Sequence, residues 1–215
     1  MLNLRRRATF AALATLVLPA AAAAQQFEGV ISLRMSGSGK AAGQTQDADY
    51  YASRSGKARI ELNSPIGKAA IIMAPADGKM YMMMDRMSQY VEQELGDVSN
   101  SSTMLSGERP RITHTGRKET IAGYECEHIT VNDIDICGAS GLGVYLNFGA
   151  NLMSRGGIQP WQSAVLEENV FPLKVTLPDG TVQMLVTKIE KKVVDPEMFR
   201  VPANFSKIAM PPRGG

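Results

Sequence analysis

The chain has 215 residues, with 23 Lys and Arg against 21 Asp and Glu, and 44% of its residues are hydrophobic. A formal net charge of +2, with both signs interspersed, lacks the basic excess that binding to a phosphate backbone requires, so we exclude nucleic acid as the partner. The length suits a leader followed by one domain with a proper core.

The first 24 residues have the pattern of a secretory signal peptide. Three arginines at residues 5–7 precede an uncharged run over residues 8–18, and alanines occupy residues 22–24. The run is too short to span a membrane, which takes about 20 apolar residues. We expect cleavage before Gln25 and export to the periplasm, with a single domain over 25–215 and no transmembrane segment in the mature chain. Because three arginines and no acidic residue leave with the signal, the formal net charge becomes −1.

The first half of the mature chain reads as an antiparallel meander. Apolar and polar residues alternate with period two, and turn-forming residues separate the alternating stretches. A strand beginning around Tyr50 precedes a stretch whose alternation is especially regular. The expected strands are 27–35, one from about 50, 57–62, 68–74, 79–84 and 89–92.

The second half adds more strands and a helical insertion. Periodicity fails over 93–109, which we expect to be an exposed linker or a frayed short helix. Further strands are expected over 111–115, 124–131, 134–137, 173–177 and 181–190, and helices over part of 138–154 and over 161–167. The predicted fold is mainly β (α+β): a curved antiparallel sheet or half-barrel covered by one or two helices.

Two cysteines, Cys126 and Cys137, remain in a chain sent to an oxidising compartment, so we predict a structural disulfide. The two histidines, His114 and His128, both lie in expected strands. A three-ligand zinc site would therefore have to recruit distant carboxylates, and we predict no metal site. Asp133 and Asp135 beside Asn132 fit a hairpin turn better than a calcium site.

Five methionines cluster over residues 80–87. Thioethers fill irregular cores and adaptable apolar sites, and they are also soft ligands for Cu(I). We favour core or pocket lining, because alternation places Met80, Met82 and Met84 on one face and leaves Met83 and Met87 outside it. Copper binding stays a weaker alternative.

No signature of a catalytic site is present in the sequence. There is no Gly-x-Ser-x-Gly elbow, and neither histidine belongs to a triad signature. Residues 37–40, Gly-Ser-Gly-Lys, lack the spacing of a phosphate-binding loop. We expect a protein that is not an enzyme and needs no cofactor.

Several fragments together resemble a family of exported bacterial proteins of unknown function. This family is similar to the periplasmic lipoprotein carriers of the LolA and LolB type and to the sigma-factor regulator RseB. The resemblance implies a curved antiparallel sheet closed by helices over an apolar cavity, and it carries no catalytic motif. The fragments are 27–29 (Phe-Glu-Gly), 57–60 (Lys-Ala-Arg-Ile), 115–126, 171–174 (Phe-Pro-Leu-Lys) and 199–202 (Phe-Arg-Val-Pro).

The function expected from these observations is a periplasmic binding protein that holds a lipid, an acyl chain or a lipidated partner such as a lipoprotein. The alternative is a structural or regulatory envelope protein that acts through contacts with another envelope protein. The residues expected to line the apolar site are Ile60, Leu62, Ile71, Met73, Met82 and Met84.

Overall fold

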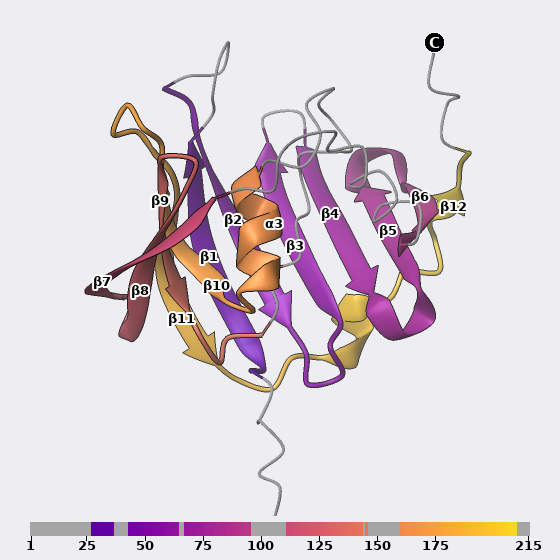
Figure 1. Ribbon diagram of the computed structural model, residues 1–215. Helices are drawn as coiled ribbons and strands as arrows, with labels where there is room; N and C mark the ends of the chain where they lie inside the picture. Colours follow the sequence, from indigo (N-terminus) through magenta and orange to yellow (C-terminus); the bar gives the residue numbers. More distant parts are fainter. Residues whose placement is uncertain are drawn as a thin grey trace, which may run out of the picture.

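The computed structural model describes residues 27–36, 43–64, 67–95, 111–143, 145 and 160–209. Within this part, twelve strands form one long, open, curved sheet (Figure 1). The strands are β1 (Gly29–Ser36), β2 (Thr45–Ala52), β3 (Ala58–Ser64), β4 (Gly67–Ala74), β5 (Lys79–Met84), β6 (Gln89–Glu94), β7 (Ile112–Ile121), β8 (Tyr124–Val131), β9 (Ile134–Ala139), β10 (Phe171–Thr176), β11 (Val182–Lys191) and β12 (Ser206–Lys207).

One α-helix has both ends within the described residues, α3 (Pro160–Glu167), and it confirms the helix expected over 161–167. The described part of the chain also contains three 3-10 turns, η2 (Pro75–Asp77), η3 (Asp85–Met87) and η4 (Pro196–Phe199). In the described residues, no helix has the length and apolar character needed to cross a membrane. The signal peptide, most of the linker expected over 93–109 and most of the helix expected within 138–154 lie outside the described residues. Gln93 and Glu94, which we expected in that linker, belong to β6 instead.

The sheet consists of two meanders that meet in its centre. Its order is β12-β6-β5-β4-β3-β2-β1-β11-β10-β9-β8-β7, so β1 to β6 run one way and β11 to β7 run the other. The join is the antiparallel pair β1 and β11, in which Gly29 lies opposite Lys191. The predicted mainly-β, open antiparallel sheet is confirmed, with one exception: β12 pairs with β6 in parallel.

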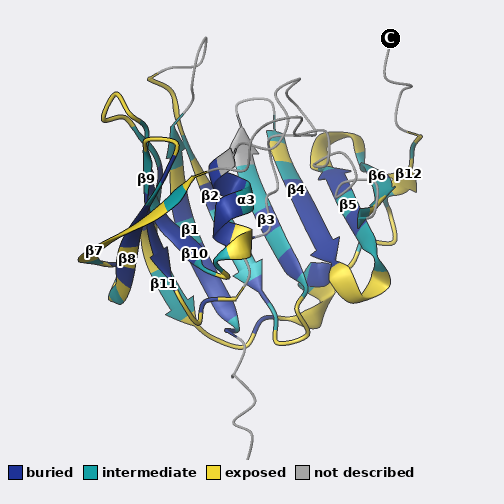
Figure 2. Cartoon of the chain, in the orientation of Figure 1, coloured by how far each residue is buried: buried dark blue, intermediate teal, exposed yellow. Residues whose placement is uncertain are grey.

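The principal core lies on the concave face, where α3 sits within the curve of the sheet (Figure 1). Trp161, Ala164 and Val165 of α3 belong to the same buried cluster as Ile31 and Leu33 of β1. Figure 2 shows the buried residues as dark bands on α3 and along the central strands. Period-two alternation produces this pattern because every second side chain of a strand points to the same face.

A second, smaller core lies on the opposite face of β4 and β5. There the segment that follows β11 crosses the sheet, and its Val194 and Phe199 pack with Ala70, Ile72 and Met83. The segment is also held by polar contacts: Arg59 Nη1 donates to the carbonyl of Met198 at 3.1 Å. We call residues 192–205 the C-terminal strap, and we had not predicted that it packs on the sheet.

Two of the expected strand boundaries were wrong by five or more residues. Strand β2 begins at Thr45, ahead of the start expected around Tyr50. Strand β7 continues to Ile121, whereas we expected it to end at residue 115. Gly116 and the charged residues after it form an irregular stretch of this strand at the end of the sheet. The register there shifts between His114 and Lys118, and Gly116 has a φ of +70°.

Candidate functional site

The six residues predicted to line the site lie on one face of neighbouring strands. Ile60, Ile71 and Met82 are directly opposite one another in β3, β4 and β5. Met73 occupies the next row, opposite Ala58 and Met80. The remaining row contains Leu62 and Met84, each paired with Ala69.

Burial separates these six residues into two groups. Ile60, Ile71, Met73 and Met82 are buried in the concave core, with at most 9% of each residue exposed. Leu62 is half-buried and packs against that core, and Met84 is half-buried at its margin. The structure thus brings the six onto the expected face, and their contact with a ligand stays a prediction.

The methionine cluster is divided by the sheet. Met80 and Met82 belong to the concave core, whereas Met83 is buried in the core under the C-terminal strap. Met87 is 58% exposed in η3. Because the sheet lies between Met82 and Met83, the five thioethers do not converge on one point, which weakens the copper alternative.

A group of aromatic side chains connects α3 to the centre of the concave face. Tyr145 stacks on Trp161 with ring centroids 6.1 Å apart, and it meets Phe171 edge-to-face at 5.5 Å. Phe171 in turn contacts Tyr50 of β2 at 5.2 Å. Burial raises the pKa of Tyr145 to about 12, because the phenolate would lose its hydration there.

Trp161 carries an unsatisfied donor. Its residue is only 3% exposed, yet its indole N–H has no hydrogen-bond partner among the described residues. A buried donor without a partner costs about 1–3 kcal/mol relative to a satisfied one. An acceptor oxygen placed on this face by a bound molecule would remove that cost.

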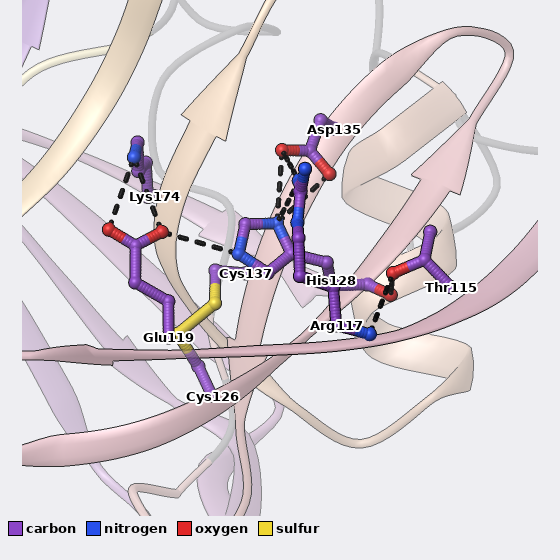
Figure 3. Close-up of a disulfide and its surroundings, with 8 residues drawn as sticks. All are labelled: Thr115, Arg117, Glu119, Cys126, His128, Asp135, Cys137 and Lys174. Atoms are coloured by element: carbon purple, nitrogen blue, oxygen red, sulfur yellow. Dashed lines mark hydrogen bonds and ion pairs between the residues drawn. A yellow bond between two sulfur atoms is a disulfide. The ribbon is translucent and has the colours of Figure 1, made fainter.

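Figure 3 shows a separate polar cluster, which we call the His128 cluster. Its Lys174 alternates along β10 with Leu173 and Val175 of the concave core, so the cluster lies on the other face of β7 to β10. His128 and Cys126 alternate along β8 with Glu127 and Ile129, so the two pairs point to opposite faces. His128 Nδ1 lies 3.0 Å from both carboxylate oxygens of Asp135, and its Nε2 lies 3.2 Å from Glu119 Oε2.

Two basic side chains complete the His128 cluster. Arg117 Nη2 lies 2.7 Å from His128 Nδ1 and donates to Asp135 Oδ2 at 2.8 Å. Lys174 Nζ donates to both oxygens of Glu119, at 3.2 and 3.3 Å. Only 3% of His128 is exposed, so these contacts replace the water that a surface histidine would have.

The predicted disulfide is confirmed beside this cluster. Cys126 and Cys137 are bonded, with Cα atoms 5.3 Å apart. The hairpin turn expected at Asn132 and Asp133 is also confirmed, since both residues have positive φ, 47° and 67°. Asp135 follows that turn in β9, within the strand expected over 134–137, and contacts His128.

Sequence reasoning did not find the acidic and basic members of the His128 cluster. Glu119 lies in the part of β7 that we had not predicted, and Lys174 approaches it from β10. The available signal was the spacing Cys126-x-His128, which places both side chains on one face of a strand. The identity of the neighbouring strands follows only from the sheet order.

Similarity to solved structures extends over most of the chain. An uncharacterised conserved protein from Thermus thermophilus is 8% identical, with a TM-score of 0.52, over 87% of this chain and 93% of that one. This likeness shows the fold alone.

Two further solved structures are similar at lower TM-scores. A LolA superfamily protein from Nitrosomonas europaea is 13% identical, with a TM-score of 0.33, over 82% of this chain and 90% of that one. LprF from Mycobacterium bovis is 11% identical, with a TM-score of 0.31, over 86% and 92% of the two chains. Among curated proteins, none matches this sequence. A family model matches residues 27–205, and the chain therefore belongs to the family described as Domain of unknown function (DUF4412).

Proposed function

We propose that this protein is a non-enzymatic periplasmic binding protein that holds the acyl chain of a lipid or of a lipidated partner against its concave face. The observation that carries the proposal is the buried indole N–H of Trp161, which has no acceptor among the described residues although Trp161 belongs to the hydrophobic core. An acyl chain ends in a carboxylate or ester carbonyl, and such an oxygen would accept from this N–H while the chain lies along the rows of Ile60, Ile71 and Met82.

The affinity of such a complex depends on how many methylenes of the ligand are buried. Each buried methylene contributes about 0.8 kcal/mol, so ten of them supply about 8 kcal/mol before the entropic costs of binding. A Kd of about 1 μM corresponds to a net 8 kcal/mol, so after the entropic costs ten methylenes bind more weakly than this and a longer acyl chain binds more tightly. Methionine side chains suit the task because their unbranched thioethers adapt to chains of different shape.

The first test asks whether the exported protein carries a lipid. The chain is expressed with its leader in a bacterial periplasm and purified without detergent, and its native mass spectrum is recorded. We expect a mass above that of residues 25–215 which falls to the chain mass on denaturation, with a lipid in the extract. A bare chain that also binds no fluorescent fatty acid would contradict the proposal.

A matched pair of variants locates the ligand. Met82→Ala and Met83→Ala remove the same side chain from adjacent positions on opposite faces of β5. Met82→Ala should weaken fatty-acid binding about five- to tenfold, while Met83→Ala should lower stability and leave the affinity unchanged. Equal effects of the two variants would place the ligand elsewhere.

The polar end of the ligand is tested separately. Trp161→Phe removes the unsatisfied N–H and keeps an aromatic ring. It should weaken the binding of a fatty acid about tenfold and leave the binding of a hydrocarbon probe of equal length unchanged. Equal losses for both probes would show that the N–H does not contact the ligand's oxygen.

One observation favours a second candidate function, the recognition of an envelope protein. Strand β7 forms one end of the sheet, and most of its ten residues are exposed. An extended segment of a partner could pair with such an edge. Thr113→Pro, which removes a backbone donor there, would then abolish capture of a cross-linked partner and leave lipid binding intact.

A further inference from the structure

Four side chains with metal-binding atoms meet on the face of β7, β8 and β9 that carries the His128 cluster. Glu119 lies opposite Cys126, and His128 lies opposite Cys137, so the four occupy adjacent positions in two rows. The ligand atoms of Glu119, His128 and Cys137 all lie within 4.8 Å of one another, and Cys126 Sγ is bonded to Cys137 Sγ. We propose that these four residues bind one divalent ion of the zinc class when the disulfide is reduced.

The donor set fits that class of ion. Two thiolates, one imidazole and one carboxylate give the four ligands that zinc takes in a tetrahedron. Bond lengths of about 2.0 to 2.3 Å then separate the ligand atoms by roughly 3.3 to 3.8 Å. His128 Nε2 and Glu119 Oε2, at 3.2 Å, are already close to that spacing.

The surroundings of His128 support the same assignment. A metal-binding histidine typically donates its second ring N–H to a carboxylate, which fixes the ring and directs the other nitrogen at the ion. Asp135 stands in that position at 3.0 Å from Nδ1. Arg117 Nη2 lies 2.7 Å from the same nitrogen and 2.8 Å from Asp135 Oδ2. In the metal-bound form Nδ1 would carry the proton and donate to Asp135, and Arg117 would donate to Asp135 alone. Thr115 anchors the strand next to them by donating to the carbonyl of His128 at 2.8 Å.

The charges also balance. Two thiolates and the carboxylate of Glu119 carry three negative charges, which a divalent ion reduces to one. Lys174 and Arg117 compensate that remaining charge together with the charge of Asp135, so the charges of the metal-bound cluster sum to zero. The side chain of Glu119 is 38% exposed, so an ion can reach the site from this side of β7.

The proposed metal site forms only when the disulfide is reduced. While Cys126 and Cys137 are bonded, neither sulfur is a thiolate, and two of the four ligands are missing. Exchange with a dithiol reductant transfers two electrons and two protons to the pair, and the reductant leaves as its own cyclic disulfide. Binding of the ion then releases the two thiol protons.

The experiment titrates the purified protein with Co²⁺ and Zn²⁺, before and after reduction by a trialkylphosphine, which takes its oxygen from water. The oxidised protein should bind neither ion at this site. The reduced protein should bind one Co²⁺ with a thiolate-to-cobalt charge-transfer absorption, and one equivalent of Zn²⁺ should displace it. Circular dichroism recorded alongside must retain the β-sheet signal.

Two histidine variants provide the matched comparison. His128→Ala should weaken Co²⁺ binding by the reduced protein at least tenfold, whereas His114→Ala, on the same sheet but outside the cluster, should bind like the parent. Absence of the thiolate absorption in the reduced protein, equal binding by the oxidised protein, or equal affinity of the two variants would overturn the proposal. A reduced chain that unfolds and is not refolded by zinc would overturn it as well.

Discussion

The Cys126–Cys137 disulfide should contribute a measurable part of the stability of this protein. The bond joins residues 11 apart in the sequence. In the chain-entropy description, closing a loop of that length removes about 9 cal/mol/K from the unfolded state, or about 2.8 kcal/mol at 25 °C. The double variant Cys126→Ala/Cys137→Ala should therefore lose roughly this free energy of unfolding, while the backbone pairs of β8 and β9 remain.

Urea unfolding followed by circular dichroism measures this loss. With a denaturant slope of about 2–3 kcal/mol/M, the midpoint should fall by about 1 M at an unchanged slope. The reduced wild-type protein without metal should unfold at the same midpoint as the variant. A loss below about 1 kcal/mol would refute the reasoning, because it would mean that the unfolded chain already holds the two cysteines together.

Three further outcomes follow from individual positions. A Cβ added at Gly138 would lie 2.7 Å from Val170 Cγ2, so Gly138→Ala should lower the free energy of unfolding in urea by about 1–3 kcal/mol. Val170→Ala in that background should recover part of this loss. If the losses of the two single variants simply add, the two side chains do not clash. Asp133 has a φ of 67° in the hairpin turn, a backbone conformation that glycine adopts without strain. Asp133→Gly should therefore raise the free energy of unfolding by about 0.5 kcal/mol, and Asp133→Ala should lower the free energy of unfolding. The reverse order of melting temperatures would be evidence against the turn. The pKa of Tyr145 rises from 10.0 to about 12 on folding, because its hydroxyl is buried. Its contribution to stability is therefore complete below pH 10 and falls by about 2–3 kcal/mol as the pH rises to 12. Tyr145→Phe should show a smaller decline over this range, and identical pH profiles of the two proteins would disprove the burial of the hydroxyl.

The sequence contained enough information for most of the fold. Alternation in residues 57–62 assigned Ile60 and Leu62 to one face, and they face the concave core. The same rule separated Met82 from Met83 correctly. It did not identify the C-terminal strap, because Phe199 and its neighbours have no strand periodicity and are buried only through contact with β4 and β5.

The candidate sites were harder to predict, for a physical reason. The His128 cluster depends on the order of β7, β8, β9 and β10, and that order arises from long-range pairing rather than from local pattern. Glu119 looked like one more solvated charge in a polar stretch. The unsatisfied N–H of Trp161 is likewise invisible in sequence, since any indole could find an acceptor on a neighbouring element.

The pairing of β1 with β11 has a consequence for how the chain folds. These central strands come from opposite ends of the domain, with Gly29 opposite Lys191. A chain that emerges amino terminus first can form the meander of β1 to β6, but the free edge of β1 stays open until residues 182–191 are available. Open strand edges attract other chains, and such non-local closure is slow. The unfinished half-sheet is therefore the species in which we expect aggregation and the need for a chaperone, and truncations that end before β11 should accumulate it.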